Sequence, residues 1–545
     1  MHVVAVLRQV FDNPDVRRVQ GGWLLAITAE WIYLVNLLVL AYLLGGVLGV
    51  GVVGMLRTLP AAVLGPLLAA LSDRYPRQHV LLAVHSLRCL LILFTALAAT
   101  GDLPAVLIFG AALLEGIVAT LHRATTMSLM PALATSPEEL VASNVAISLS
   151  EGLGVLVGPA LGGLLAAAVG PQTGLLAGSL GFGLAALALL GLHSVAGPRR
   201  AAPGSTGRSR PAELLAGFKA LRDYPHVGLL VLLVGSQTFV RGILTVLLVA
   251  VAVELLLLGE GGVGYLNSAI GAGGLIGGVL ALALVSRRSL AVPLVLALAL
   301  WGLPIAGVGL FPSAVLAFAL MGVVGAANAV LDISAFTLLQ RTVPNRVRGR
   351  VLGALEGLVA LTVGLGSLVA PLLVLLAGLE GALVITGLLL PAVAVLGLRS
   401  VRTVEAGAVV PEREMKLLRS VPIFAPLPLT IIEQLAADLE PHSFAAGTEI
   451  VRQGDQGDCY YIVAAGRVAV IHDGKQVAQL SEGEGFGEIA LLREVPRTAT
   501  VRAQTELEIL RLGRHEFLSA VTGSPPSTQA ADAVVGARLH ALGHD

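Results

Sequence analysis

Long apolar segments follow one another along most of this chain, from residue 22 to residue 398. A helix needs about 20 predominantly apolar residues to cross a bilayer, and each segment is close to that length or longer. We therefore predict twelve membrane-spanning helices. Their expected ranges are 22–43, 47–71, 79–99, 102–122, 139–168, 171–192, 224–254, 261–285, 290–310, 313–338, 348–376 and 378–398.

Arginine residues gather in alternate connections between these segments. Arg17, Arg123, Arg287 and Arg346 fall on one side of the alternation, whereas connections on the other side, such as Gly45–Gly46, carry almost no cations. Positively charged loops stay in the cytoplasm. The pattern therefore predicts a multi-pass protein of the plasma membrane, embedded in lipid, with both termini in the cytoplasm.

A polar stretch rich in Arg, Pro and Gly divides the twelve segments into two sets of six. The two sets echo each other, because the pattern of Gly49–Gly51 returns at Gly262–Gly264 with similar neighbours at a constant offset. Internal repeats of this kind are typical of duplicated transporters, although glycine-rich helices also resemble one another by chance. The expected parts are an N-terminal cytoplasmic segment at 1–21, a first half at 22–193, a cytoplasmic linker at 194–223 and a second half at 224–398.

Beyond Leu398 the long apolar segments end, and short strand-like segments split by glycine turns begin. Examples are Tyr460–Val463 and Gln476–Leu480, with Asp473–Gly474 as one of the turns. The expected fold is an all-α polytopic bundle of twelve membrane helices, followed by a cytoplasmic β-roll of the jelly-roll kind with short helices. The expected ranges are a linker at 399–415, the β domain at 416–520 and a tail at 521–545.

Composition agrees with a membrane protein and narrows the chemistry. Of the 545 residues, 56% are hydrophobic and 13% are charged, whereas soluble proteins carry about 25% charged residues. The net charge is zero, so nothing favours nucleic acid as a partner. The two cysteines, Cys89 and Cys459, have no companions at metal-ligand spacing. Because the sequence contains neither an ATPase phosphate loop nor a recognisable hydrolytic triad, we expect no enzyme, no metal and no resident cofactor.

Six ionisable residues lie within the predicted membrane helices, five of them well inside and Glu30 nearer the cytoplasm. A charge inside a membrane is costly and usually functional. The six are Glu30, Glu151, Arg57, Arg241, Glu115 and Glu356. A carboxylate in a low-dielectric cavity can take up and release a proton, and the first two are the leading candidates for that role. The two arginines are candidate counter-charges or contacts to an anionic substrate, and the last two glutamates are further coupling candidates. For each residue, a buried pair that only fixes helix packing is the alternative. Asn328 and Asp332 also share one face of the tenth helix.

The connection after the second apolar segment carries a distinctive pattern. Gly65–Gln78 resembles the cytoplasmic loop signature of the major facilitator superfamily. The resemblance implies that Asp73, Arg74 and Arg77 lock the two halves together on the cytoplasmic side. Pro76 and Gln78 depart from the residues usual in the family, which implies a weaker lock.

A second resemblance to the same superfamily lies in the fifth segment. A glycine–proline signature typical of its exporters is matched by Gly154, Gly158, Pro159 and Gly162. Glycines let helices approach closely, and a proline bends a helix. Leu129–Leu133 and Leu339–Pro344 extend the resemblance to the branch that exports siderophores and macrolides.

The sharpest resemblance lies in the β domain. Phe486–Leu492 and Val495–Val501 are similar to the phosphate-binding cassette of cyclic-nucleotide-binding domains. The resemblance implies cAMP or cGMP as a regulatory ligand. The implied contacts are Gly487, Glu488, Ala490, Arg497 and Thr498.

The chemistry of a cyclic nucleotide explains this choice of residues. The free N–H groups of the short helix opened by Gly487, that of Ala490 among them, receive the phosphate. Arg497 offers its planar fork to the phosphate oxygens. Glu488 is placed to accept the ribose 2′-hydroxyl, and Thr498 can bond the phosphate or the purine edge.

Together these features predict a secondary transporter that exports small molecules in exchange for protons and is regulated by a cyclic nucleotide. The alternative is a membrane-tethered nucleotide sensor whose helical bundle no longer transports. The sequence leaves open the transported substrate, the choice between cAMP and cGMP, and the oligomeric state.

Overall fold

The chain forms two compact units, Met1–Gly407 and Ala408–Asp545. The structure, a computed structural model, describes residues 13–133, 137–192, 225–282, 290–343, 345–407 and 412–541. The predicted linker at 194–223 lies outside these residues, as does most of the predicted N-terminal segment.

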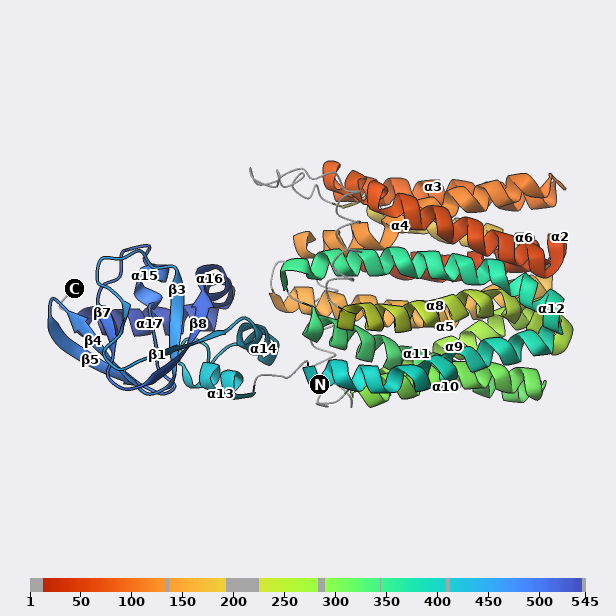
Figure 1. Ribbon diagram of the computed structural model, residues 1–545. Coiled ribbons are helices and arrows are strands. Elements are labelled where there is room, and N and C mark those ends of the chain that lie inside the picture. Colours follow the sequence, from red (N-terminus) through yellow and green to blue (C-terminus); the bar gives the residue numbers. More distant parts are fainter. Residues whose placement is uncertain are drawn as a thin grey trace. The chain divides into compact units, whose positions relative to one another are not determined.

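The first unit is a bundle of long helices that run side by side (Figure 1). They are α2 (Pro14–Arg74), α3 (Arg77–Thr100), α4 (Ala105–Leu133), α5 (Pro137–Val169), α6 (Pro171–Leu189), α8 (Pro225–Ala250) with the π-helical turn η1 (Val251–Leu255), α9 (Gly259–Leu282), α10 (Ala291–Leu310), α11 (Ala314–Thr342) and α12 (Asn345–Gly407). Among the described residues, 10 helices are long and apolar enough to cross a membrane.

Two of these helices are long enough to span a bilayer twice. The backbone of α2 leaves the helical conformation at Gly45 and Gly46, and that of α12 does so at Gly378. Gly46 and Gly378 have positive φ angles, which only glycine adopts readily. Each of the two helices therefore covers two of the predicted segments and changes direction between them, while the count of twelve spans stays a prediction.

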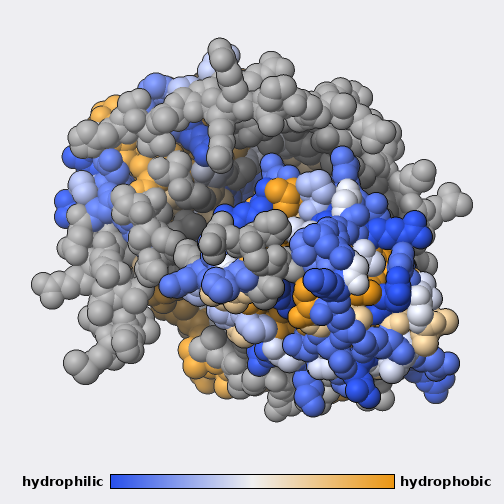
Figure 2. Space-filling view, turned by 90° about the vertical axis from the view of Figure 1, so that its left-hand side faces the viewer, coloured by the Kyte–Doolittle hydropathy of each residue, from blue (hydrophilic) through white to orange (hydrophobic). Residues whose placement is uncertain are grey.

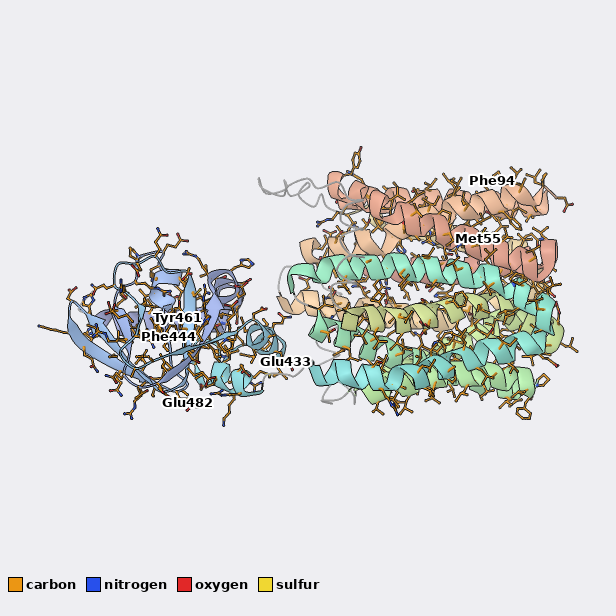
Figure 3. All side chains as sticks on the ribbon, in the orientation of Figure 1. Met55, Phe94, Glu433, Phe444, Tyr461 and Glu482 are labelled. Atoms are coloured by element: carbon orange, nitrogen blue, oxygen red, sulfur yellow. The ribbon has the colours of Figure 1, made fainter. Side chains whose placement is uncertain are left out.

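The outer surface of the bundle is apolar, as lipid requires. Leu48, Val315 and Leu375 are 62%, 81% and 81% exposed, and Phe94 points outward from α3 (Figure 3). The face of the second unit seen in Figure 2 instead carries mostly hydrophilic side chains. The helical unit is thus built for a hydrocarbon environment and the second unit for water.

Close contacts join the two sets of helices along two seams. In one, α5 meets α9, and a methyl group added at Gly264 would overlap the carbonyl oxygen of Pro159 and the backbone of Gly163. In the other, α2 meets α12, and a methyl group at Gly54 would come within 2.7 Å of the hydroxyl oxygen of Ser367. Small residues let these backbones approach closely.

Three segments differ from the sequence expectations. Arg123, expected in a connection, lies inside α4, because that helix continues to Leu133. Helix α12 continues to Gly407 through much of the expected linker, since no proline or glycine stops it between Leu398 and that residue. The expected tail after residue 520 contains the helix α17 (Pro525–Ala541).

The second unit is a β-roll of two four-stranded antiparallel sheets, with order β1-β8-β3-β6 and β2-β7-β4-β5. The strands are β1 (Glu440–Phe444), β2 (Glu449–Val451), β3 (Cys459–Ala465), β4 (Arg467–His472), β5 (Lys475–Ser481), β6 (Gly485–Phe486), β7 (Thr500–Ala503) and β8 (Leu507–Gly513). The other helices are α13 (Glu412–Ser420), α14 (Leu429–Ala437), α15 (Glu488–Leu492) and α16 (Arg514–Thr522). The predicted Asp473–Gly474 turn joins β4 to β5, and both residues have positive φ.

Two apolar cores stabilise this unit. Val463, Phe486 and Ile509 are buried between the sheets, where Figure 3 also shows Tyr461. A second core joins the helices to the first sheet through Tyr460, whose ring stacks on that of Phe517 with 4.7 Å between the centroids. The second core holds the short helices against the sheet from which the candidate site is built.

Candidate functional site

The second unit contains a cavity of about 110 Å³ between the β-roll and its last helix. Apolar side chains, among them Val451, Leu480 and Val501, form its walls. All five cassette residues singled out in the sequence belong to α15 or its flanks. All five line the cavity, namely Gly487, Glu488, Ala490, Arg497 and Thr498.

Gly487 shapes the entrance to α15. Its φ angle is 103°, and it is the residue immediately before the helix. A side chain here would be strained by that angle, and its first carbon would lie 3.0 Å from the carbonyl oxygen of Cys459 and overlap the guanidinium of Arg497. Glycine therefore lets the backbone turn sharply into α15, whose first N–H groups have no partner within the helix.

Arg497 is a buried cation, 5% exposed. Its Nη1 donates to the carbonyl oxygen of Gly487 at 3.0 Å, and its Nη2 donates to that of Cys459 at 2.7 Å. The guanidinium carbon also lies 5.7 Å from the centre of the Tyr461 ring. These contacts fix the cation beside α15 while leaving part of its fork available to an anion.

Glu488 is a buried anion on the same short helix, 1% exposed. Its Oε1 accepts a hydrogen bond from Nη1 of Arg538 at 2.8 Å. Its Oε2 has no hydrogen-bond partner among the described residues. A buried carboxylate oxygen without a donor is costly, so this atom marks a place where a ligand hydroxyl would be held.

Arg538 is a site residue that the sequence did not reveal. It comes from α17, 50 residues after Glu488, and lines the cavity. Burial alone would lower the pKa of Arg538, but the negative charge of Glu488 raises it above the ordinary value. Burial also raises the pKa of Tyr460, and the Glu488 charge adds to that effect. Arg538 therefore stays positively charged, and its bond to Glu488 ties α17 to the cassette.

The remaining two cassette residues, Ala490 and Thr498, lie beside these charged groups at the wall of the cavity. Ala490 is the third residue of α15 and is buried, and its methyl group would overlap any side chain added at Gly457. The carbonyl oxygen of Thr498 accepts a hydrogen bond from Nδ1 of His472 at 2.8 Å. The Thr498 side chain is half-buried at the cavity wall.

In the helical unit, three of the six candidate charges form one network. Glu115 is fully buried and binds two arginines: its Oε2 lies 3.1 Å from Nη2 of Arg57, and its Oε1 lies 2.6 Å from Nη2 of Arg88. Glu30 pairs with Arg88 at 3.4 Å and remains 30% exposed. The sequence analysis overlooked Arg88, although an arginine inside an apolar segment is itself a signal.

The other three candidate charges lie outside this network. Glu151 pairs with Arg123 at 3.4 Å. Arg241 and Glu356 are exposed within α8 and α12. The structure thus separates Glu30, which is partly accessible and holds one ion pair, from Glu115, which is enclosed between two cations.

The structure describes part of the loop motif at residues 73–77 and the whole glycine–proline motif of α5. The side chains of Asp73 and Arg74 lie outside the described part of the structure, whereas Arg77 donates from Nη1 to the carbonyl oxygen of Ser128 at 2.8 Å. The three motif glycines of α5 lie on one face against α2, where Gly154 faces Ile27, Gly158 faces Trp31 and Gly162 faces Ile32. Pro159 lies inside α5 and its carbonyl oxygen faces α9.

Comparison with known proteins divides the chain in the same way. A family model described as Major Facilitator Superfamily matches residues 22–359, and one described as cyclic nucleotide-binding domain matches residues 441–523. The siderophore and macrolide branch is not distinguished by these matches.

Several curated relatives and solved structures are similar to part of this chain. The cAMP-dependent protein kinase regulatory subunit of Yarrowia lipolytica is 38% identical over 102 residues, which are 18% of this chain and 27% of that protein. Its counterpart from Neurospora crassa is 37% identical over 102 residues, covering 18% and 26%. The regulatory domain of Toxoplasma gondii PKA, crystallised with cAMP, is 30% identical, with a TM-score of 0.21 over 22% of this chain and 46% of that chain. The chain thus spans about a quarter of the length of these curated relatives.

Proposed function

The chain belongs to the Major Facilitator Superfamily, and we propose that it is a proton-coupled exporter of small molecules whose transport cycle is regulated by cAMP or cGMP. In this proposal the bundle lies in the plasma membrane with both termini cytoplasmic, as the arginine-rich connections predict. The second unit would then lie in the cytoplasm, the compartment in which cyclic nucleotides are made.

One observation carries the regulatory part of the proposal. A buried cation, Arg497, and a buried anion with one unpartnered oxygen, Glu488, line the same cavity. A cyclic nucleotide carries an anionic phosphate next to a ribose hydroxyl donor, so its two polar groups match the two charges in sign. The apolar wall formed by residues such as Val470 and Leu480 suits the face of a purine.

Calorimetry on the full chain in detergent tests this site. Wild type is expected to bind cAMP or cGMP, and Arg497→Ala is expected to lose about 1.5–3 kcal/mol of binding free energy, the range for a hydrogen bond to a charged group. Arg467→Ala is the matched control, because Arg467 is exposed at the start of β4. Equal affinities in wild type and Arg497→Ala would remove Arg497 from the phosphate site.

The coupling part of the proposal assigns the proton to Glu30. This carboxylate is partly exposed, and among the described residues one cation, Arg88, pairs with it at 3.4 Å. It can therefore exchange a proton with water and release Arg88 when neutral. Glu151 is the second candidate, since it is 28% exposed and pairs with the exposed Arg123. Glu115, enclosed between two arginines, instead supports a fixed structural role.

Vesicles with an imposed pH gradient test the coupling. Glu30→Gln and Glu151→Gln are measured with a panel of fluorescent amphipathic compounds, alongside Asp102→Asn as a control in an exposed turn. Loss of gradient-driven efflux in Glu30→Gln, with exchange of substrate across the membrane retained, supports proton binding there. Full gradient-driven efflux in both glutamate variants would remove both from the coupling role.

A membrane-tethered nucleotide sensor is the alternative. The glycine seams between α5 and α9 and between α2 and α12 favour a working transporter, because close small-residue contacts let helices pack and slide without interlocked side chains. A sensor without transport would bind cyclic nucleotide tightly, yet vesicles would move no compound of the panel in either direction.

A further inference from the structure

The second half of the bundle contains a carboxylate, Asp332, that neither family signature explains. Asp332 lies in α11, ten residues before Thr342 at the helix end, which places it about 15 Å along the helix axis from that end. Its side chain is not covered by other side chains of the bundle in spite of this depth. Val323, a 40% exposed apolar residue of the same helix, lies nine residues earlier, or about two and a half turns, on the opposite face. Asn328, one turn before Asp332 on the same face, bonds to Gln237 of α8 and Trp301 of α10. Asp332 therefore points toward the neighbouring helices and away from the face that carries Val323.

An arginine in α8 repeats this arrangement. Arg241 lies 16 residues after Pro225, where the helix begins, and it is exposed. Leu232, 62% exposed, again lies nine residues earlier on the opposite face. Both helices thus turn an apolar side chain toward lipid and a charged side chain toward the interior. Gln237, one turn before Arg241, bonds to Asn328, one turn before Asp332, so the two charged residues lie on facing sides of α8 and α11. They form no ion pair among the interactions of the described residues.

An amide network anchored on two buried side chains holds Asp332 in place. Asn328, one turn earlier on α11, donates from Nδ2 to Oδ2 of Asp332 at 2.8 Å. The Oδ1 of Asn328 accepts from Nε1 of Trp301 at 3.1 Å and from Nε2 of Gln237 at 3.2 Å. Trp301 and Gln237 are 3% and 2% exposed. Because two donors occupy the amide oxygen, the amide nitrogen must face the carboxylate.

This network orients a negative charge without neutralising it. One oxygen of Asp332 takes a neutral amide, and no cation lies within ion-pair distance among the described residues. Such a charge inside a membrane is costly and is retained where it contacts a substrate or an ion. Phe336, 40% exposed and one turn beyond Asp332, adds an aromatic surface beside the carboxylate.

We infer that Asp332 and Arg241 bind the two ends of an aromatic zwitterion, with the carboxylate holding an ammonium group and the guanidinium holding a carboxylate. This inference names the substrate class and rests on the proposed transport function. Phe336 contacts the ring of the substrate, and Asn328 is a positioning residue that acts through Asp332. An isolated cation or anion would leave one of the two protein charges unpaired in the membrane, which is why the zwitterion is preferred.

A matched pair of dyes tests the substrate class. The probes are a xanthene dye that carries both a cationic amine and a free carboxylate, and its methyl ester, which keeps only the cation. Fluorescence anisotropy with the full chain in lipid nanodiscs measures binding of both dyes. Wild type is expected to bind the zwitterion at least about 10-fold more tightly than the ester. Arg241→Gln should remove this preference, and Asp332→Asn should weaken both dyes, while Asp102→Asn should behave like wild type.

The outcomes separate this inference from the exporter proposal. Equal binding of both dyes by wild type, or binding of neither, overturns the zwitterion site. If the Arg241→Gln/Asp332→Asn double variant regains the thermal stability that the single variants lose and binds both dyes like wild type, the two residues form a structural pair and the inference is wrong.

Transport in vesicles separates the substrate class from the exporter proposal. Gradient-driven efflux of the ester, without any preference for the zwitterion, would retain the exporter and reject only its substrate class. Absence of gradient-driven efflux for both dyes, together with zwitterion-selective binding, would reject coupled export and retain the site.

Discussion

Replacing Glu488 by glutamine tests how the cavity would recognise a ribose. Oε2 of Glu488 is buried and without a donor among the described residues, so a ligand hydroxyl placed there would form a hydrogen bond to a full negative charge. Such a bond contributes about 1.5–3 kcal/mol, which corresponds to about 10- to 150-fold in affinity. Wild type should therefore bind cAMP or cGMP more tightly than the matching 2′-deoxy nucleotide by this factor.

In Glu488→Gln the acceptor is neutral, and the preference should fall to about 5-fold or less. The measurement is titration calorimetry of the full chain with ribose and 2′-deoxy ligands, which closes a double-mutant cycle. Because the substitution also removes the partner of Arg538, a thermal melt of each variant accompanies the titration. Glu482→Gln is the matched control, since Glu482 is exposed before β6 (Figure 3).

The cycle distinguishes a direct contact from a folding effect. If the glutamine variant loses affinity equally for both ligands, Glu488 acts through the fold of α15 and not through the ribose. If wild type itself binds both ligands equally, the hydroxyl does not meet Glu488, and the orientation of the nucleotide assumed here is wrong.

Two further substitutions and one labelling experiment test separate parts of the structure. Glu115→Gln should destabilise the helical unit by about 3–5 kcal/mol, because it leaves Arg57 and Arg88 buried without a full counter-charge; unchanged thermal unfolding in nanodiscs would refute this role. Gly264→Leu should separate α9 from α5 and slow transport in vesicles, since even a methyl group there overlaps the α5 backbone; wild-type transport would show that the seam opens freely. Cys459 should react with a maleimide much more slowly in the folded protein than in the denatured chain, because it is buried and burial raises the pKa of its thiol; equal rates would contradict that burial.

The nucleotide cassette could be predicted from sequence because its determinants are local. Gly487, Glu488 and Arg497 lie within eleven consecutive residues. The role expected of each one depends on residues close to it in the chain. Strands and turns of the β-roll could also be predicted from the sequence, for example the tight turn at Asp473–Gly474. The contact of Arg538 was not readable, because it depends on how α17 packs 50 residues further along the chain.

The surroundings of the candidate charges in the helical unit were predicted less completely, for physical reasons. An apolar sequence shows that a charge such as Glu115 is inside the membrane, but the direction of its side chain depends on the packing of neighbouring helices. The structure therefore supplied the partners: Arg88 from α3 for Glu115 and Glu30, and Trp301 from α10 for Asn328. Helix ends were displaced for a related reason, since polar residues such as Arg123 continue a helix when no glycine or proline ends it.

The most direct test of nucleotide-regulated transport is the distance between two predicted cytoplasmic ends of the bundle. Spin labels at His79 and Ser400, both exposed, are followed by pulsed electron resonance in nanodiscs, with Cys89 and Cys459 replaced by alanine. Cyclic nucleotide should change the populations of the two conformational states by about 5- to 150-fold, which corresponds to a coupling free energy of about 1–3 kcal/mol. Arg497→Ala should abolish the change. The account is contradicted if saturating nucleotide leaves the distance distribution unchanged in the protein that retains Arg497, while calorimetry shows that the nucleotide is bound.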